Sequence, residues 1–188
     1  MHPRLAEVMD FVERKRKELL QSFAGVAPEP MRRRVSDESW SVAEIIDHLR
    51  LVETSVAQVI TRRAADARAK GVGEERSTES VLNTLDRLEI EAATHLMEAP
   101  SIVRPRPYAD PADAIAGLDE SRRSLREAAA SVNGLALGEI KQLHRGLGEE
   151  LDLYQWLVFL GQHEGRHARQ IQRTLDTTRV GDRSLTQR

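Results

Sequence analysis

The sequence predicts an all-α protein, an up-down four-helix bundle over residues 1–176, with a polar tail at residues 177–188. Apolar residues recur at the three- and four-residue spacing of amphipathic helices in five separate segments. No alternating strand pattern persists for more than a few residues. The chain has 188 residues and is 40% hydrophobic, which suits one domain with a core of its own.

Start and stop signals bound the helical segments, which we expect at residues 3–23, 41–70, 77–98, 111–132 and 152–175. Ser41 and Glu44 form a capping box at the start of the second segment, and Gly71 and Gly73 end it. The segment at 77–98 is an extra helical stretch beyond the four helices of the bundle. A proline-rich linker with Pro100, Pro105, Pro107 and Pro111 follows this segment. We expect the linker to be extended, because proline disfavours helix at the residue before it. Three glycines within residues 135–150 predict a loop before the last helix.

Composition excludes several classes of function. The 28 Lys and Arg residues nearly balance the 30 Asp and Glu residues, which gives no electrostatic basis for binding nucleic acid. No stretch approaches the roughly 20 apolar residues of a membrane span. The N-terminal residues carry an early acid and no apolar core, so they do not form a secretory signal. The chain has no cysteine, so a thiol nucleophile would have to come from a partner molecule, and we expect the cytoplasm as its location.

The last helical segment carries the strongest functional signal. On a helical wheel, His163 and His167 lie on the same side as its apolar residues, one turn apart, where both imidazoles can reach one metal ion. His48 lies on the apolar stripe of the second segment. Imidazoles buried without partners are costly, and a shared divalent cation would satisfy all three. Zinc or nickel suits such ligands best, with iron, manganese and copper as alternatives. Three protein ligands leave a coordination position open, as in catalytic sites. Hydrogen-bonded core histidines are the structural alternative.

Residues 163–167 also match the H-E-x-x-H pattern of zinc proteases, whose glutamate is the general base. No histidine or glutamate follows His167, and no strand is predicted that could align a peptide, which argues against a protease. Glu164 still lies near the inward stripe, where it could act as a catalytic base or orient a ligand. The structural alternative is an ion pair with Arg166 or Arg169.

The remaining histidines carry weaker signals. His144 lies in the glycine-rich loop before the last helix, where it could line the mouth of the site or lie on the surface. We interpret His2 and His95 as structural or solvent-exposed residues.

Two segments resemble the signatures of the DinB/YfiT-like superfamily. One comprises residues 40–49 with Val52 and Glu53, and the other runs from His144 through residues 153–157 to residues 163–171. The resemblance covers nearly the whole chain. It implies a four-helix bundle of the DinB/YfiT-like type, metal ligation by His48, His163 and His167, and a homodimer. The extra helical stretch and the proline-rich linker depart from the family pattern.

The same resemblance implies three possible functions. Some members are thiol S-transferases that use bacillithiol, mycothiol or glutathione, so this chain would transfer a low-molecular-weight thiol to an electrophilic small molecule. Others are described as metal-dependent hydrolases, in which a water molecule bound to the metal is the nucleophile. The third possibility is a metal-stabilised binding or stress-response module without catalysis.

Overall fold

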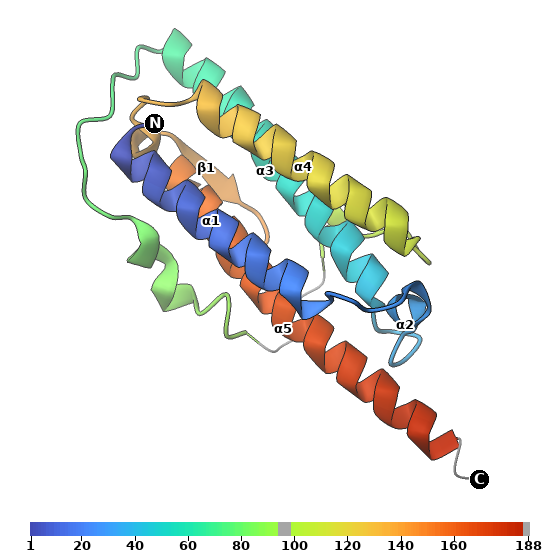
Figure 1. Cartoon of the computed structure of the whole chain (residues 1–188). Coiled ribbons are helices and arrows are strands. Elements are labelled where there is room, and N and C mark those ends of the chain that lie inside the picture. The colour runs from blue at the N-terminus through green and yellow to red at the C-terminus, as the bar shows by residue number, and fades with distance from the viewer. Residues whose placement is uncertain (94–98, 186–188) are drawn as a thin grey trace.

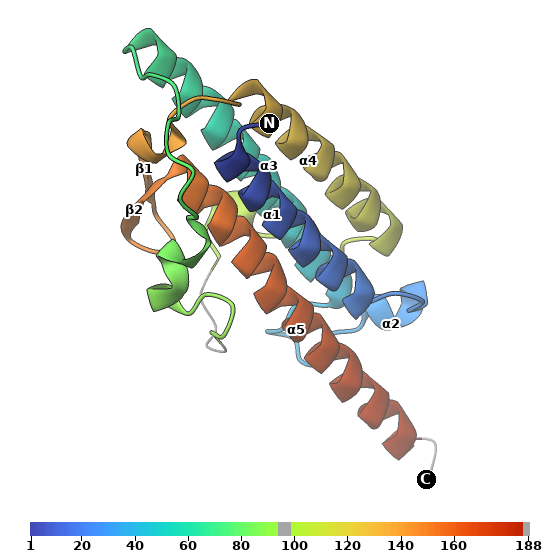
Figure 2. The ribbon, with the colours of Figure 1, turned by 60° about the vertical axis from the view of Figure 1, so that its left-hand side comes forward.

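The computed structural model describes residues 1–93 and 99–185, with side chains to residue 179, and the four-helix bundle is confirmed (Figure 1). Its long helices are α1 (Pro3–Ser22), α3 (Val42–Ala69), α4 (Pro111–Ser131) and α5 (Leu153–Leu185). Helices α1 and α5 form one side-by-side pair, and α3 and α4 form the other, running in the opposite direction (Figures 1 and 2). Because α3 and α4 run parallel, the chain between them must cross the full length of the bundle.

The helix starts follow the local chemistry of the sequence. The capping box at α3 is confirmed: Ser41 Oγ accepts from the Glu44 amide at 3.2 Å, and Glu44 Oε2 accepts from the Ser41 amide at 2.8 Å. The side chain of Asp110 caps α4 by accepting from the amides of Ala112 and Asp113, with Pro111 at the first helical position. A single-turn helix, α2 (Pro28–Arg32), was not expected and begins at another proline.

The prediction of a helix at residues 77–98 is wrong for the part that the structure describes; residues 94–98, with His95, lie outside it. A short 3₁₀ helix, η1 (Leu82–Leu88), replaces it, and Glu89 ends this helix in the left-handed region at φ 45°. Leu82, Leu85 and Leu88 recur every three residues, so three residues per turn align them on one face. All three pack against the core of the bundle, and this contact decides the local structure. A second 3₁₀ turn, η2 (Ser101–Val103), lies in the proline-rich linker.

The loop expected at residues 135–150 instead contains a 3₁₀ turn, η3 (Leu137–Glu139), and a small hairpin. Strand β1 (Lys141–His144) pairs antiparallel with β2 (Glu149–Asp152). Each strand has four residues, too few for an alternating pattern to stand out in the sequence. Gly148 adopts φ 70° in the turn, where a side chain would be strained.

The last helix is longer than expected. We expected it to end at residue 175, but it continues to Leu185 and so includes most of the polar tail at residues 177–188. No proline follows residue 111, and a single glycine at 181 costs only about 1 kcal/mol within a helix. In Figure 1, this helix extends past the ends of its neighbours.

The interior consists of two apolar clusters with a polar layer between them. In this layer, Arg16 of α1 pairs with Glu53 of α3 at 2.8 Å and with Glu164 of α5 at 2.6 Å. Arg122 of α4 pairs with the same two carboxylates, at 2.8 Å each, and Ser121 donates to Glu53. All of these residues are buried. Each of the four helices therefore contributes at least one group to one buried ion-pair layer.

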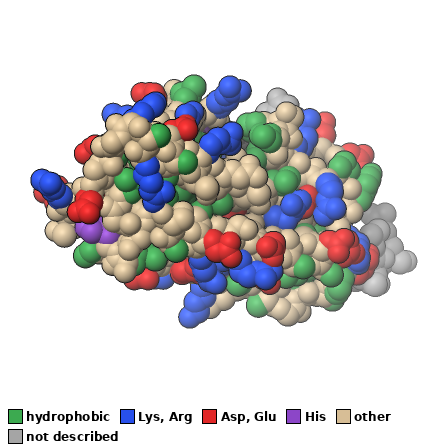
Figure 3. All heavy atoms as spheres, turned by 90° about the horizontal axis from the view of Figure 1, so that it is seen from above, with side chains coloured by type: hydrophobic (Ala, Val, Ile, Leu, Met, Phe, Trp, Pro, Cys, Tyr) green, Lys and Arg blue, Asp and Glu red, His purple; other side chains and the backbone are tan. Residues whose placement is uncertain are grey.

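The face of the molecule seen from above is mixed in charge, with hydrophobic side chains between the charged ones (Figure 3). Figure 3 shows acidic and basic side chains interspersed over the face seen from above. Among the described residues, no helix combines the length and the apolar character that a membrane span requires.

Candidate metal centre

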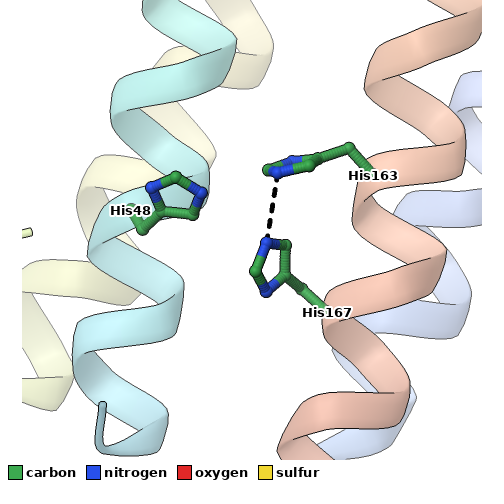
Figure 4. Close-up of side chains that lie close together, drawn as sticks. All are labelled: His48, His163 and His167. Atoms are coloured by element: carbon green, nitrogen blue, oxygen red, sulfur yellow. Dashed lines mark hydrogen bonds between the residues drawn. The ribbon is translucent and has the colours of Figure 1, made fainter. Parts of the chain in front are cut away.

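Three histidines converge between α3 and α5. Figure 4 shows the imidazole of His48 on α3 facing those of His163 and His167 on α5. The ring centroids lie 5.2 Å (His48–His163), 5.1 Å (His48–His167) and 4.4 Å (His163–His167) apart. One ring nitrogen of each residue lies within 4.8 Å of the others, and all three residues are buried. The convergence predicted from the two helical stripes is therefore present.

The pair on α5 is already close enough to share a ligand. The Nε2 atoms of His163 and His167 lie 3.1 Å apart, as expected for side chains one turn apart on the same helix face. His167 donates from Nδ1 to the side-chain oxygen of Gln170 at 2.7 Å, so its Nε2 carries the lone pair.

The third imidazole is oriented by the proline-rich linker. His48 donates from Nδ1 to the backbone carbonyl of Val103 at 2.7 Å, so its Nε2 also carries a lone pair. The ring of Trp40 packs against it at 4.9 Å between centroids. Such acceptors for the second nitrogen are typical of metal-ligating histidines, because they fix the tautomer and the ring direction.

The donor set fits a divalent cation. The Nε2 atoms of His48 and His167 both present lone pairs, and at most one hydrogen, on Nε2 of His163, can be donated to them. A cation accepts all three Nε2 lone pairs at once, at about 2.0–2.1 Å for zinc. Among the described residues, the group has three members and no carboxylate, so a coordination position stays open.

The pKa values of the three histidines keep the rings neutral. Burial holds the pKa of His163 well below its ordinary value, lowers that of His167 to about 3, and lowers that of His48. Desolvation is the main cause in each case, because it penalises the imidazolium form. Neutral imidazoles at pH 7 are the form that binds metal.

This burial predicts how the stability of the metal-free protein depends on pH. In the unfolded chain each histidine titrates near its ordinary value of about 6.5. Below that pH the unfolded chain binds more protons than the native state, so stability is complete above pH 6.5 and falls as pH decreases. Each of the three histidines should contribute a loss of about 1.4 kcal/mol per pH unit below 6.5, down to its own native pKa.

Urea unfolding of chelator-treated protein between pH 5 and 6.5 measures this loss. This pH interval lies above the range where most carboxylates titrate. In the variant His163→Ala, the free energy of unfolding should depend on pH less steeply, by the contribution of one proton. Equal slopes in the two proteins would contradict the prediction.

A cavity of about 1030 Å³ opens beside the histidines. Valines of α3, residues of η1, η2, the hairpin and α5, and the three histidines form its walls. Three arginines line the cavity, namely Arg104, Arg145 and Arg166, and the first two lie at exposed positions. Among the described lining residues, Glu38 is the single carboxylate, and it is also exposed. The site therefore offers an apolar chamber with a cationic bias.

Comparison with known proteins identifies the family to which this arrangement belongs. The sequence profile of the DinB superfamily matches residues 12–171. The chain belongs to the DinB superfamily. The uncharacterized protein YuaE of Bacillus subtilis (strain 168) is 27% identical over 169 residues, which cover 87% of this chain and 94% of YuaE. A solved structure, that of the four-helix bundle protein TT2238, superposes with a TM-score of 0.57 at 21% identity, covering 89% of this chain and 98% of that one. This likeness concerns the fold.

In this DinB protein, Glu164 does not lie with the three histidines. Its Oε1 atom accepts from Arg16 at 2.6 Å and from Arg122 at 2.8 Å, within the ion-pair layer. Consecutive residues leave a helix about 100° apart, so His163 and Glu164 face different neighbours. The geometry gives no support to Glu164 as a catalytic base.

The expected alternative partners of Glu164 are also wrong. Arg166 donates to the carbonyl of Ala93, and Arg169 pairs with Glu91. The actual partners, Arg16 and Arg122, lie on other helices, so no local spacing could have identified them.

Two features of the DinB site were missed from the sequence. Gln170 is three residues after His167, and this spacing could have suggested it as a partner on the same face. The Val103 carbonyl carries no signal in the sequence, because any residue has one. His144, left between two interpretations, lines the cavity.

Replacing Gln170 with alanine should weaken metal binding by about 10–100-fold, because the His167 ring loses the acceptor that fixes its tautomer and direction. Competition with a chromogenic zinc chelator measures the affinity. The matched control is Gln155→Ala, since Gln155 lies earlier on α5 and contacts Asp152 instead. Equal affinity for the Gln170 variant and wild type would show that this contact does not orient the ligand.

Proposed function

We propose that this DinB protein is a divalent-metal-dependent S-transferase, which transfers a low-molecular-weight thiol to an electrophilic small molecule. One observation carries the proposal: three neutral imidazoles meet in the wall of a mostly apolar cavity, with no carboxylate among the described residues of their group. Such a centre suits a nucleophile that the metal alone can activate. The chain has no cysteine, so the thiol must enter with its carrier molecule.

A divalent cation held by His48, His163 and His167 would lower the pKa of a bound thiol, so that a thiolate is present at neutral pH. Zinc or nickel suits three imidazole nitrogens best. The protein's own residues hold this arrangement. Val103 and Gln170 fix two of the rings, and the apolar walls reduce the access of water to the nucleophile.

The charge of the cavity favours an anionic reactant. The described lining residues include three arginines and one glutamate, which is exposed. Carboxylates are common on low-molecular-weight thiols, and arginine binds them through paired hydrogen bonds. The volume of about 1030 Å³ can hold a thiol and a second small molecule together.

The two alternatives have less support from the site. A protein base commonly assists a hydrolase by taking a proton from the metal-bound water, and the carboxylate expected to do so, Glu164, is bound to two arginines. A purely structural centre is expected to be closed by four protein ligands, whereas this group has three among the described residues.

The test is a conjugation assay with zinc- or nickel-loaded protein. Glutathione, bacillithiol, mycothiol and cysteine would each be offered with 1-chloro-2,4-dinitrobenzene. The thiolate sulfur forms a bond to the aryl carbon, the carbon–chlorine bond breaks, and chloride leaves with the electron pair. We expect one thiol to give a coloured thioether with wild type and only the uncatalysed rate with His163→Ala.

If no thiol reacts faster than the uncatalysed rate with this electrophile or with a wider panel of alkyl halides, epoxides and enones, the transferase proposal fails. Ester or amide cleavage that needs metal but no thiol would instead establish the hydrolase.

A further inference from the structure

The hairpin end of the cavity holds a histidine that the metal centre does not use. His144 is the last residue of β1 and pairs with Glu149 across the hairpin. Its Nδ1 accepts a hydrogen bond from the Leu147 amide at 3.1 Å, and the Gly148 amide donates to its carbonyl at 2.9 Å. The turn therefore fixes both the backbone and the ring of His144.

This hydrogen bond determines where the imidazole carries its proton. Since Nδ1 acts as an acceptor, the neutral ring bears its hydrogen on Nε2. Burial lowers the pKa of His144, which favours the neutral ring. Nε2 has no hydrogen-bond partner among the described residues, and His144 lines the cavity. A positioned N–H donor is therefore available to a molecule in the cavity.

One aromatic ring separates this donor from the metal centre. The ring of Phe159 lies 4.2 Å from that of His144 and 5.2 Å from that of His163, nearly parallel to the latter at 26°. Trp156 packs against His144 at 4.6 Å. A flat or extended apolar body lying along Phe159 would thus have one end at His144 and the other at the three histidines.

A neighbouring arginine indicates which group lies at the His144 end. Arg145 is the next residue along the chain, and it also lines the cavity. The other two lining arginines lie near the metal centre, since Arg104 follows Val103, the acceptor for His48, and Arg166 lowers the pKa values of all three histidines. An N–H donor next to an arginine suits an oxygen that carries negative charge. Of the common oxygen acceptors, a carboxylate satisfies both the donor and the charge.

We propose that His144 binds the carboxylate of a hydrophobic small molecule, whose apolar body lies along Phe159 toward the three-histidine group. The direction of the ligand, with its reactive end at that group, rests on the proposed function. His144 is then a binding residue for the electrophile, at the opposite end of the cavity from the thiol.

The two tryptophans of the chain allow the two ends to be monitored separately, because Trp40 packs on His48 and Trp156 on His144. In the variant Trp40→Phe, the emission of Trp156 reports on the His144 end alone. The probe is 4-phenylbutyrate, and 4-phenyl-1-butanol is the matched uncharged control. Both are titrated into metal-loaded and chelator-treated protein without any thiol.

Two further substitutions are made in the Trp40→Phe parent. His144→Phe keeps a ring against Trp156 and removes the Nε2–H donor, whereas His144→Gln retains an N–H near the position of Nε2. We expect phenylbutyrate to bind about 10-fold more weakly to the phenylalanine variant, the value of one hydrogen bond to a charged group. The glutamine variant should stay within about 3-fold of the parent, and the alcohol should bind alike to all three. Thermal unfolding of each variant checks that its fold is retained.

Equal phenylbutyrate affinity in the parent and the phenylalanine variant would overturn the proposal. So would binding that disappears on chelation but survives His144→Phe, since the carboxylate would then be held at the metal. These results do not depend on thiol transfer. Carboxylate binding without conjugation refutes the proposed function alone, and conjugation without His144-dependent binding refutes this inference alone.

Discussion

Replacing Glu164 with alanine should lower the free energy of unfolding by about 3–5 kcal/mol, because it leaves two buried guanidinium groups with one buried carboxylate, Glu53, and the partly exposed Glu13 at 3.7 Å from Arg122. Arg16 and Arg122 lie 2.6 and 2.8 Å from Glu164 and are nearly inaccessible to water. Their charge can be neutralised neither by solvent nor by ready deprotonation, since arginine keeps its proton. Chemical denaturation followed by circular dichroism measures the loss.

The control for this variant is Glu127→Ala, which removes an exposed carboxylate from α4 and should change stability by no more than about 0.5 kcal/mol. Glu164→Gln keeps the shape and removes the charge, so it should also destabilise the protein. If both Glu164 variants keep wild-type stability and lose only activity, the carboxylate serves the chemistry and the ion-pair layer is not its main role.

Replacing His163 with alanine should remove stable metal binding. Its Nε2 lies 3.1 Å from that of His167 and its ring centroid 5.2 Å from that of His48, so its removal leaves only two imidazoles of the group. Loss of an outer partner already costs about 10–100-fold in affinity, so loss of a ligand should exceed 100-fold. Metal content after gel filtration, measured by elemental analysis on wild type and variant under metal-replete conditions, gives the result.

His2→Ala is the matched control for the metal measurement, because His2 is the N-cap residue before α1 and lies outside the three-histidine group. It should retain the metal content of wild type. Equally low metal in wild type and in His163→Ala would refute the metal centre. Equally high metal in both would place the ion elsewhere in the chain.

The amino-acid sequence by itself determined the features that depend on neighbours along one helix. Local sequence predicted the Ser41 capping box and the long helices. It also predicted the inward direction of His48, His163 and His167, because the spacing of residues along a helix fixes the side on which each side chain lies. Two inward-facing stripes on packed helices then had to meet in the interior. For this reason the three-histidine group could be predicted from the sequence.

Tertiary packing alone decided the rest. The partners of Glu164 lie 148 and 42 residues away in the chain, and the acceptor for His48 is a backbone carbonyl 55 residues away. The segment of η1 forms a 3₁₀ helix, although its apolar pattern predicted an α-helix, because three residues per turn bring its three leucines onto the core together. Contacts between distant segments depend on how the four helices pack and on the path of the crossover, and local spacing along the chain carries no information about either.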